Sequence, residues 1–254
     1  MLLSMTEVGG GPPVAFLHGL LGAGQNFGSI AKAVAQRGFR VLTLDMRNHG
    51  ASPHAKTMSY LEMAEDVAET LRAAGAWPAA VIGHSMGGKI AMALALAHPE
   101  GVERLLVADI APVDYGTPVF IHYIDAMRAI ELRPGLTRRE ADAAMVAAVP
   151  EAPLRGFLLQ NLLFSEDPPR WRVPLDVLAA EIAVLGGWPD PPGRYTGKVL
   201  VLAGDRSGYT RAEYAPRFRA LFPAVRFVTI AAGHWVHADN PRAFLAEVTA
   251  FLEG

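Results

Sequence analysis

Short apolar runs alternate along this chain with longer segments in which apolar residues recur every three or four positions. The short runs cover residues 14–17, 40–44, 79–82, 104–108, 198–203 and 226–230. Runs of this length between turn residues are typical of buried strands, whereas the longer periodic segments are typical of amphipathic helices. The alternation therefore predicts an α/β fold with a mostly parallel central sheet that is flanked by helices.

Three of the longer segments carry clear helical signatures. Residues 27–37 and the closing segment from Pro241 place apolar side chains on one helical face. Residues 59–74 add a capping box, in which Ser59 precedes the helix and Glu62 occupies its third position. Each segment follows an apolar strand, so we expect these helices to cover the faces of the sheet.

Between residues 112 and 188 the strand pattern stops and helical periodicity replaces it. The helix-like stretches in this interval are residues 120–132, 137–149, 154–164 and 175–185. The strand pattern then resumes at residue 198. We therefore expect residues 1–111 and 189–254 to form one α/β core, and residues 112–188 to form a helical cap that is inserted into it.

The strand at residues 79–82 leads directly into the sequence Gly83-His84-Ser85-Met86-Gly87-Gly88, and a helical pattern follows. A strand that reverses this abruptly into a helix forces the residue at the turn into a strained backbone geometry. Gly83 and Gly87 are the small neighbours that such a turn needs. Ser85 is therefore a candidate nucleophile, exposed above the carboxyl edge of the sheet.

The same stretch also satisfies part of a phosphate-binding loop, because Gly83 to Lys89 spells Gly-x4-Gly-Lys. That loop needs Ser or Thr after the lysine to hold magnesium, and this chain has Ile90 there. Bulky residues between the glycines would in addition crowd a backbone that must wrap phosphates. The nucleotide-binding interpretation is therefore the weaker of the two.

Other strands end in residues that suit a serine nucleophile. An oxyanion hole needs two backbone N–H groups, usually one just after the nucleophile and one from the loop after the early strand. Met86 and Leu20 are the candidates for these groups. His234, after the last strand, stands where a general base for Ser85 would arrive, and Asp109 ends the strand that follows the nucleophile helix. The order Ser, Asp, His matches one of the known triad orders.

Composition and charge narrow the function further. The 254 residues have a net charge of -2 and include no cysteine. This charge does not indicate a surface that binds nucleic acid. The lack of cysteine excludes disulfides, thiol catalysis and cysteine-ligated metal sites. The first residues lack the features of a secretion signal, and no apolar run approaches the length of a membrane span. We therefore expect a cytoplasmic protein that acts on small molecules, without a nucleic-acid partner or an integral membrane segment.

Four motifs of the chain resemble those of the α/β-hydrolase superfamily. They are residues 18–22 (His-Gly-Leu-Leu-Gly), 45–52 (Asp-Met-Arg-Asn-His-Gly-Ala-Ser), 83–89 and 233–237 (Gly-His-Trp-Val-His). The Arg-Asn-His-Gly loop, the Gly-Gly-Lys after the nucleophile, the Asp-Ile-Ala-Pro at residues 109–112 and the His-Trp-Val-His ending are similar to the YbfF-type esterases and their mitochondrial abhydrolase relatives. The resemblance runs nearly end to end. It implies a carboxylesterase or thioesterase that uses no metal or cofactor.

The resemblance leaves the triad acid open among three aspartates. Many α/β-hydrolases place the acid in a Gly-x-x-Asp turn after the penultimate strand, where this chain has Ser207, with Asp205 two positions earlier. The YbfF-type pattern places the acid at Asp109. Asp176 resembles a position that is assigned to the acid in the mitochondrial relatives. Since the acid must hold the imidazole of His234 from a rigid position, Asp109 is favoured.

The expected activity is hydrolysis of esters or thioesters with small to medium acyl chains, through an acyl-enzyme on Ser85. Carbon–carbon bond hydrolysis and cofactor-free perhydrolysis use the same triad and are alternatives. A hydrolase-fold binding protein without turnover is another, although its usual mark is a broken triad. A dehalogenase or an epoxide hydrolase would carry an aspartate in place of the serine. Acyl chain length, leaving group and oligomeric state stay open.

Overall fold

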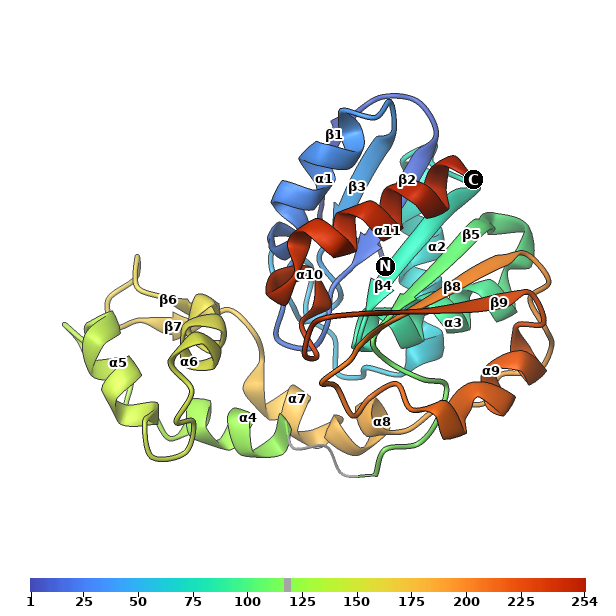
Figure 1. The fold of residues 1–254 in the computed structure, drawn as a ribbon. Coiled ribbons are helices and arrows are strands. Elements are labelled where there is room, and N and C mark those ends of the chain that lie inside the picture. The colour runs from blue at the N-terminus through green and yellow to red at the C-terminus, as the bar shows by residue number, and fades with distance from the viewer. Residues whose placement is uncertain (117–119) are drawn as a thin grey trace.

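A seven-stranded sheet forms the centre of the computed structural model, which describes residues 1–116 and 120–254 (Figure 1). The strands are β1 (Met5–Gly9), β2 (Pro13–Leu17), β3 (Arg40–Leu44), β4 (Ala79–His84), β5 (Val102–Ala108), β8 (Lys198–Gly204) and β9 (Val225–Ile230). Their order across the sheet is β1-β3-β2-β4-β5-β8-β9. β1 runs antiparallel to β3, and the other neighbouring pairs are parallel. The predicted mostly parallel sheet is confirmed.

β1 is the strand that the hydrophobic pattern did not predict. It pairs with β3 in a register that places Met5 opposite Leu44 and Gly9 opposite Arg40. Four of its five residues are exposed. A strand at the edge of a sheet that buries so little surface has no continuous apolar run, so it carries little signal in the sequence.

Helices cover both faces of the sheet. Those of the core are η1 (Gly24–Phe27), α1 (Gly28–Ala35), α2 (Tyr60–Ala73), α3 (Met86–Ala97), η2 (Pro99–Gly101), η4 (Ala212–Tyr214), α9 (Ala215–Leu221), α10 (Val236–Asp239) and α11 (Pro241–Glu253). Successive strand residues point to opposite faces. Phe16 accordingly belongs to the apolar cluster under α1 and α11, and its neighbour Leu17 belongs to the cluster under α2 and α3. Figure 1 shows α1 and α11 together on the near face.

Ser59 and Glu62 form the predicted capping box at the start of α2. The N–H of Glu62 donates to Ser59 Oγ at 3.3 Å, and the N–H of Ser59 donates to the carboxylate of Glu62 at 3.2 Å. The two bonds satisfy backbone N–H groups that the first turn of a helix cannot pair internally. Within residues 1–116 and 120–254, no helix is both long enough and apolar enough to span a bilayer.

Among the described residues between β5 and β8, the chain forms six short helices and no strand of the central sheet. These helices are α4 (Phe120–Arg128), α5 (Arg138–Met145), α6 (Ala152–Leu158), η3 (Leu159–Asn161), α7 (Leu175–Ala180) and α8 (Ile182–Gly186). In Figure 1, α4 to α6 stand away from the sheet, and α7 and α8 lead back towards the core. Residues 117–119, which fall within the predicted cap, lie outside the described residues.

One expected helix in this segment ends early. The pattern predicted helix through residue 164, but β6 (Leu162–Leu163) pairs with β7 (Arg170–Trp171) in a small antiparallel sheet. That part of the prediction was wrong, because periodicity alone does not separate a short apolar strand from the end of a buried helix.

The central strand β4 and the helix α3 approach each other closely at the turn that joins them. A Cβ atom added to Gly83 would lie 2.1 Å from the carbonyl oxygen of Gly87, and one added to Gly87 would lie 2.2 Å from the carbonyl oxygen of Leu17. Backbone atoms therefore occupy the space that a side chain would need. The prediction that this turn needs small residues is confirmed.

Replacing Gly83 with alanine tests this close approach. We expect Gly83→Ala to lower the free energy of unfolding by about 3 kcal/mol, because the new methyl group has to push the backbone of α3 away from the sheet. Gly28→Ala is the matched control, since a Cβ at the start of α1 meets open space and alanine is the better helix former. Urea denaturation measures both variants. Equal stabilities would contradict the close packing.

Candidate active site

Ser85 lies at the sharp turn between β4 and α3. Its backbone adopts φ 53° and ψ −121°, a conformation that residues with side chains rarely occupy. The N–H of Ser85 donates to the carbonyl of Ala108 at 3.0 Å, and the carbonyl of Ser85 accepts from the N–H of Gly88 at 2.8 Å. The sheet and the helix together therefore hold the strained turn in place.

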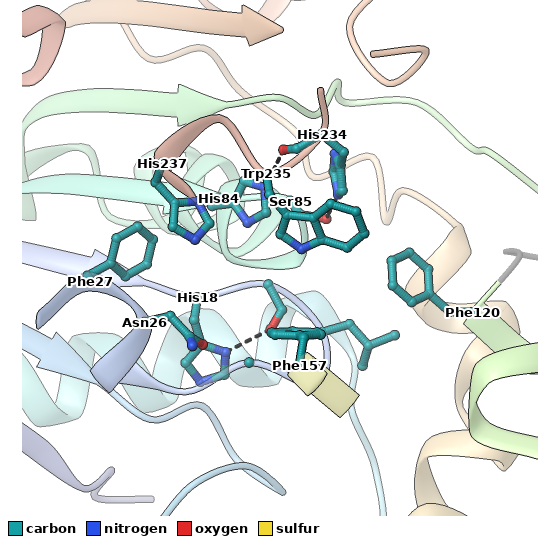
Figure 2. A pocket seen from close by; sticks show the side chains of 13 residues that line it. His18, Asn26, Phe27, His84, Ser85, Phe120, Phe157, His234, Trp235 and His237 are labelled. Carbon is teal, nitrogen blue, oxygen red and sulfur yellow. Dashed lines mark hydrogen bonds between the residues drawn. The ribbon is translucent and has the colours of Figure 1, made fainter. Parts of the chain in front are cut away.

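His234 joins Ser85 to Asp109. In Figure 2, Ser85 and His234 border one pocket, with Phe157 and Phe120 on its other side. His234 Nε2 lies 3.0 Å from Ser85 Oγ, and His234 Nδ1 lies 2.8 Å from Asp109 Oδ2. An ionised carboxylate only accepts hydrogen bonds, so Nδ1 carries the proton and Nε2 accepts from the serine hydroxyl. In this arrangement the imidazole can take the serine proton.

Asp109 is fully buried at the end of β5. Its Oδ1 accepts from the N–H of Gly204 at 3.1 Å, and its Oδ2 accepts from the Ser207 hydroxyl as well as from His234. The backbone of Asp109 has φ 52°, in the left-handed region that Asp and Asn tolerate better than most residues. Three hydrogen bonds thus hold the carboxylate and offset the cost of burying it.

The other two candidate acids lie elsewhere. Asp205 accepts from a backbone N–H at 2.9 Å and pairs with Arg206 at the surface. Asp176, on α7, pairs with Arg128 at 2.8 Å, and its side chain is 87% exposed. The structure therefore brings Asp109 to the imidazole of His234 and leaves these two carboxylates with other partners.

The sequence did not predict one contact of Asp109 and one contact of His234. Ser207 stands where many α/β-hydrolases carry the acid, and its hydroxyl donates to the carboxylate of Asp109. Tyr209 packs its ring against the imidazole of His234, with 4.1 Å between ring centroids. The position of Ser207 in the turn after β8 was a usable signal for the first contact. Nothing in the spacing marked the second.

Leu20 and Met86, the two residues expected to supply oxyanion N–H groups, line one cavity together with Ser85. Leu20 lies in the loop after β2, and Met86 is the first residue of α3, where N–H groups have no partner within the helix. In the part of the chain that the structure describes, neither N–H donates to a protein acceptor. A Cβ added to Gly19 would lie 3.2 Å from the Cβ of Ser85, so this loop runs close to the serine. The two amides can therefore receive a charged oxygen next to Ser85.

Two buried side chains hold the loop after β2 at Leu21, which has φ 62°. His49 Nε2 accepts from the N–H of Leu21 at 3.0 Å, while His49 Nδ1–H donates to the carbonyl of Arg47 at 2.9 Å. The side-chain amide of Asn161 donates to the carbonyl of Leu21 at 2.8 Å. His49 and Asn161 thus fix the backbone of the loop that carries Leu20. The role of Asn161 had no signal in the sequence.

The histidines around the site are neutral at pH 7. Burial lowers the pKa of His18 and of His237 to about 4, lowers the pKa of His49 to about 3, and holds the pKa of His84 well below its usual range. His84 Nε2–H donates to the backbone carbonyl of His234 at 2.8 Å. These rings therefore add no positive charge that would oppose formation of an imidazolium at His234.

Comparison with known proteins places the chain among hydrolases. The model of the alpha/beta hydrolase fold family matches residues 12–186. The chain is 44% identical over 250 residues to the sn-1-specific diacylglycerol lipase ABHD11 of Mus musculus, which covers 95% of this chain and 81% of the relative. It is 35% identical over 241 residues to Esterase YbfF of Escherichia coli, which covers 94% of this chain and 92% of the relative.

A solved structure of an esterase is also similar to this chain. The protein described as "Marine microorganism esterase" superposes with a TM-score of 0.94 and 36% identity, over 98% of this chain and 99% of that one. The resemblance drawn from the four sequence motifs is therefore confirmed, both for the superfamily and for the YbfF-type and abhydrolase relatives.

The lowered pKa values of the buried histidines predict how the free energy of unfolding depends on pH. Between pH 6.5 and about 4 the unfolded chain binds protons on these residues that the folded chain does not bind, so the free energy of unfolding should fall as the pH falls through this range. His49→Gln keeps an acceptor for the N–H of Leu21 but does not titrate. The free energy of unfolding of this variant should change less steeply with pH than that of the wild type, by the contribution of about one proton. Urea denaturation at several pH values measures the slope, and an unchanged slope would contradict a neutral, buried His49.

Proposed function

The chain belongs to the α/β-hydrolase fold family, and from this premise we propose that it is a carboxylesterase-type serine hydrolase whose catalytic triad is Ser85, His234 and Asp109. The observation that carries the proposal is the pair of hydrogen bonds through which the imidazole of His234 links the serine hydroxyl to the buried carboxylate. The names of the relatives and of the structural neighbour, lipase and esterase, support ester hydrolysis.

The reaction begins when Ser85 Oγ attacks the carbonyl carbon of an ester or thioester and His234 Nε2 takes the serine proton. The N–H groups of Leu20 and Met86 stabilise the oxyanion that forms. Collapse of the tetrahedral intermediate expels the alcohol or thiol, which receives the proton from His234 and leaves an acyl-enzyme. A water molecule then attacks with the same imidazole as base, so that the carboxylic acid departs and Ser85 regains its proton.

Asp109 holds the imidazole of His234 in the required tautomer and stabilises its positive charge. Three hydrogen bonds hold Asp109 inside the core, so its carboxylate can stabilise the imidazolium without a change in its position. Asp205 and Asp176 lack this placement. We assign the acid role to Asp109 on these grounds.

We assign residues 112–188 as a cap over the site. Phe120 and Phe157 from this segment line the pocket that contains Ser85 and His234. Their rings supply apolar surface next to the reacting groups, which suits the hydrocarbon part of an acyl ester and excludes water from it.

Removing the nucleophile tests the proposal. We expect Ser85→Ala to lower ester turnover on the order of 10⁶-fold without changing the unfolding transition, because alanine leaves no large cavity. A fluorophosphonate probe should label the wild type and fail to label the variant. Ester hydrolysis that survives in Ser85→Ala would rule out the acyl-enzyme on this residue.

Three matched substitutions test the acid. Asp109→Asn should lower kcat by about 10⁴-fold, because the amide favours the wrong imidazole tautomer. Asp205→Asn and Asp176→Asn make the same chemical change at the other two candidates and should keep turnover near that of the wild type. A loss in either of these variants that matches the loss in Asp109→Asn would reassign the acid.

A further inference from the structure

Two pockets border Ser85, and one of them continues into a large cleft. The arrangement of these three spaces indicates where the two parts of a substrate can lie. The small pocket of Figure 2 shares Phe157, His234 and Trp235 with a large cleft of about 1120 Å³. It shares Leu20, Ser85 and Phe120 with an inner cavity of about 40 Å³. Among the described residues, the inner cavity and the large cleft have no lining residue in common. Ser85 therefore lies between the inner cavity and the small pocket, and the small pocket opens into the large cleft.

The chemistry of the step decides which part of the substrate lies on which side. His234 must hand its proton to the oxygen or sulfur of the leaving group, so the leaving group has to lie next to His234. His234 lines the small pocket and the large cleft. The inner cavity is lined instead by Ser85, Leu20 and Met86, and it is separated from the imidazole of His234 by the ring of Tyr209, which packs against that imidazole. The acyl chain, which must point away from the imidazole, is thus directed into the inner cavity.

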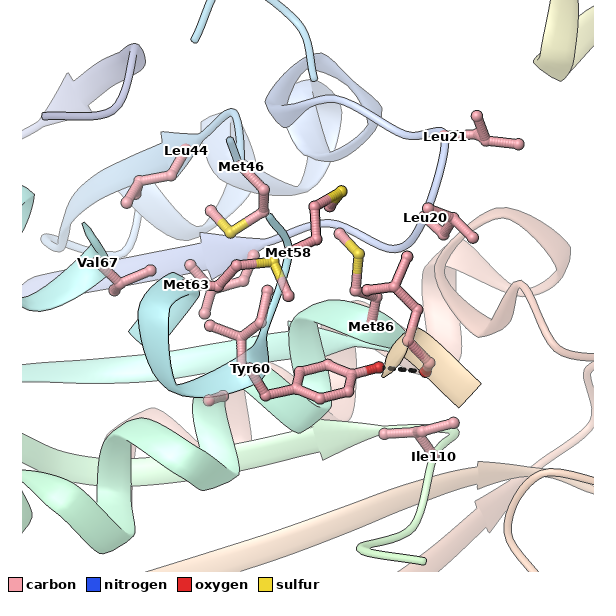
Figure 3. Close-up of a cluster of buried hydrophobic side chains, with 14 of the residues drawn as sticks. Leu20, Leu21, Leu44, Met46, Met58, Tyr60, Met63, Val67, Met86 and Ile110 are labelled. Carbon is pink, nitrogen blue, oxygen red and sulfur yellow. Dashed lines mark hydrogen bonds between the residues drawn. The ribbon is translucent and has the colours of Figure 1, made fainter. Parts of the chain in front are cut away.

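Lys89 and Tyr60 form the far part of this cavity. Lys89 lies one turn of α3 beyond Ser85. Its Nζ donates to the carbonyl of Gly186 at 3.0 Å and to the carbonyl of Gly187 at 2.5 Å. The hydroxyl of Tyr60 donates to the carbonyl of Leu185 at 2.6 Å, beside Met86 and Ile110 in Figure 3. Two buried side chains of the core thus hold three consecutive carbonyls at the end of α8.

The surroundings of Lys89 favour this arrangement. The last carbonyls of a helix carry partial negative charge, which a lysine complements. The ammonium also lies 5.4 Å from the ring of Tyr60 and 4.8 Å from the ring of Tyr115, within range of cation–π attraction. The N–H of Tyr115 donates to the carbonyl of Gly186 at 3.0 Å. The segment that leaves the core after β5 is therefore hydrogen-bonded to the end of α8, where the chain returns to the core.

We propose that the inner cavity receives the acyl group, and that Lys89 and Tyr60 limit the length of that group by holding Leu185 and Gly186, which line the cavity, together with the adjoining Gly187. The inference rests on the proposed function and names its substrate class. A space of about 10–15 Å³ holds one water molecule, so the cavity holds about three or four groups of that size. The substrates are esters with short acyl chains, from acetyl to about butyryl, that carry bulky leaving groups in the large cleft.

Matched p-nitrophenyl esters from acetate to octanoate test the proposal. The readout is the ratio of kcat/KM for hexanoate to kcat/KM for acetate, because the active fraction of a preparation cancels from this ratio. The wild type should strongly prefer acetate. Lys89→Met keeps a long unbranched side chain but loses both hydrogen bonds, so the end of the cavity is released and the ratio should rise about tenfold. Tyr60→Phe loses one hydrogen bond and should raise the ratio in the same direction.

Tyr195→Phe is the matched control. Its buried hydroxyl donates to the carbonyl of Val102 at 2.8 Å, at the opposite end of β5 from the site. The variant loses the same chemical group as Tyr60→Phe and should keep the wild-type ratio. If Lys89→Met does not fold, Tyr60→Phe decides the question, since it removes a single oxygen atom.

Two results would overturn the inference and leave the proposed function intact. One is a wild type that cleaves octanoate as well as acetate in a reaction that depends on Ser85. The other is an unchanged ratio in Tyr60→Phe and in every folded preparation of Lys89→Met. Absence of Ser85-dependent cleavage with all of the esters would overturn the proposed function itself, and the inference with it.

Discussion

The site depends on the close contact between the backbones of β4 and α3. Gly83 and Gly87 leave no room for side chains, so the chain can reverse within one residue and Ser85 takes the strained conformation. The strain does not relax, because hydrogen bonds from β5 and from the first turn of α3 hold both sides of the serine peptide. The same reversal makes Met86 the first residue of α3, directly after the serine. One packing constraint thus positions both of these neighbouring residues at the site.

The parallel sheet brings the remaining groups to this turn. The carboxyl ends of parallel strands lie at one edge, so residues that follow β2, β4, β5 and β9 meet there although they are far apart in the chain. Asp109 benefits further from its neighbour β8, which supplies the N–H of Gly204 and the hydroxyl of Ser207. These partners fix the orientation of the buried carboxylate, and its Oδ2 faces the imidazole of His234.

Patterns among neighbouring residues in the sequence were sufficient to predict the buried strands and the turn at Ser85. The apolar runs predicted six of the seven strands of the main sheet, and the glycines marked the turn at Ser85. β1 was missed because its side chains are exposed, and β6 and β7 because two residues are too few for a period. Among the triad candidates, Asp109, Asp205 and Asp176 differ in partners that are distant in sequence. No spacing rule shows such contacts, so only the folded arrangement distinguishes them.

The segment between β5 and β8 contacts the surroundings of Ser85 at two separate points. The side-chain amide of Asn161 donates to the carbonyl of Leu21 in the loop that carries Leu20. Lys89 binds the end of α8, beside the cavity on the other side of Ser85. A shift of this segment would therefore move the loop that carries Leu20 and the lining of the cavity beside Lys89 together. Buried hydrogen bonds at both points oppose such a shift, because breaking either one leaves polar groups without partners in the core.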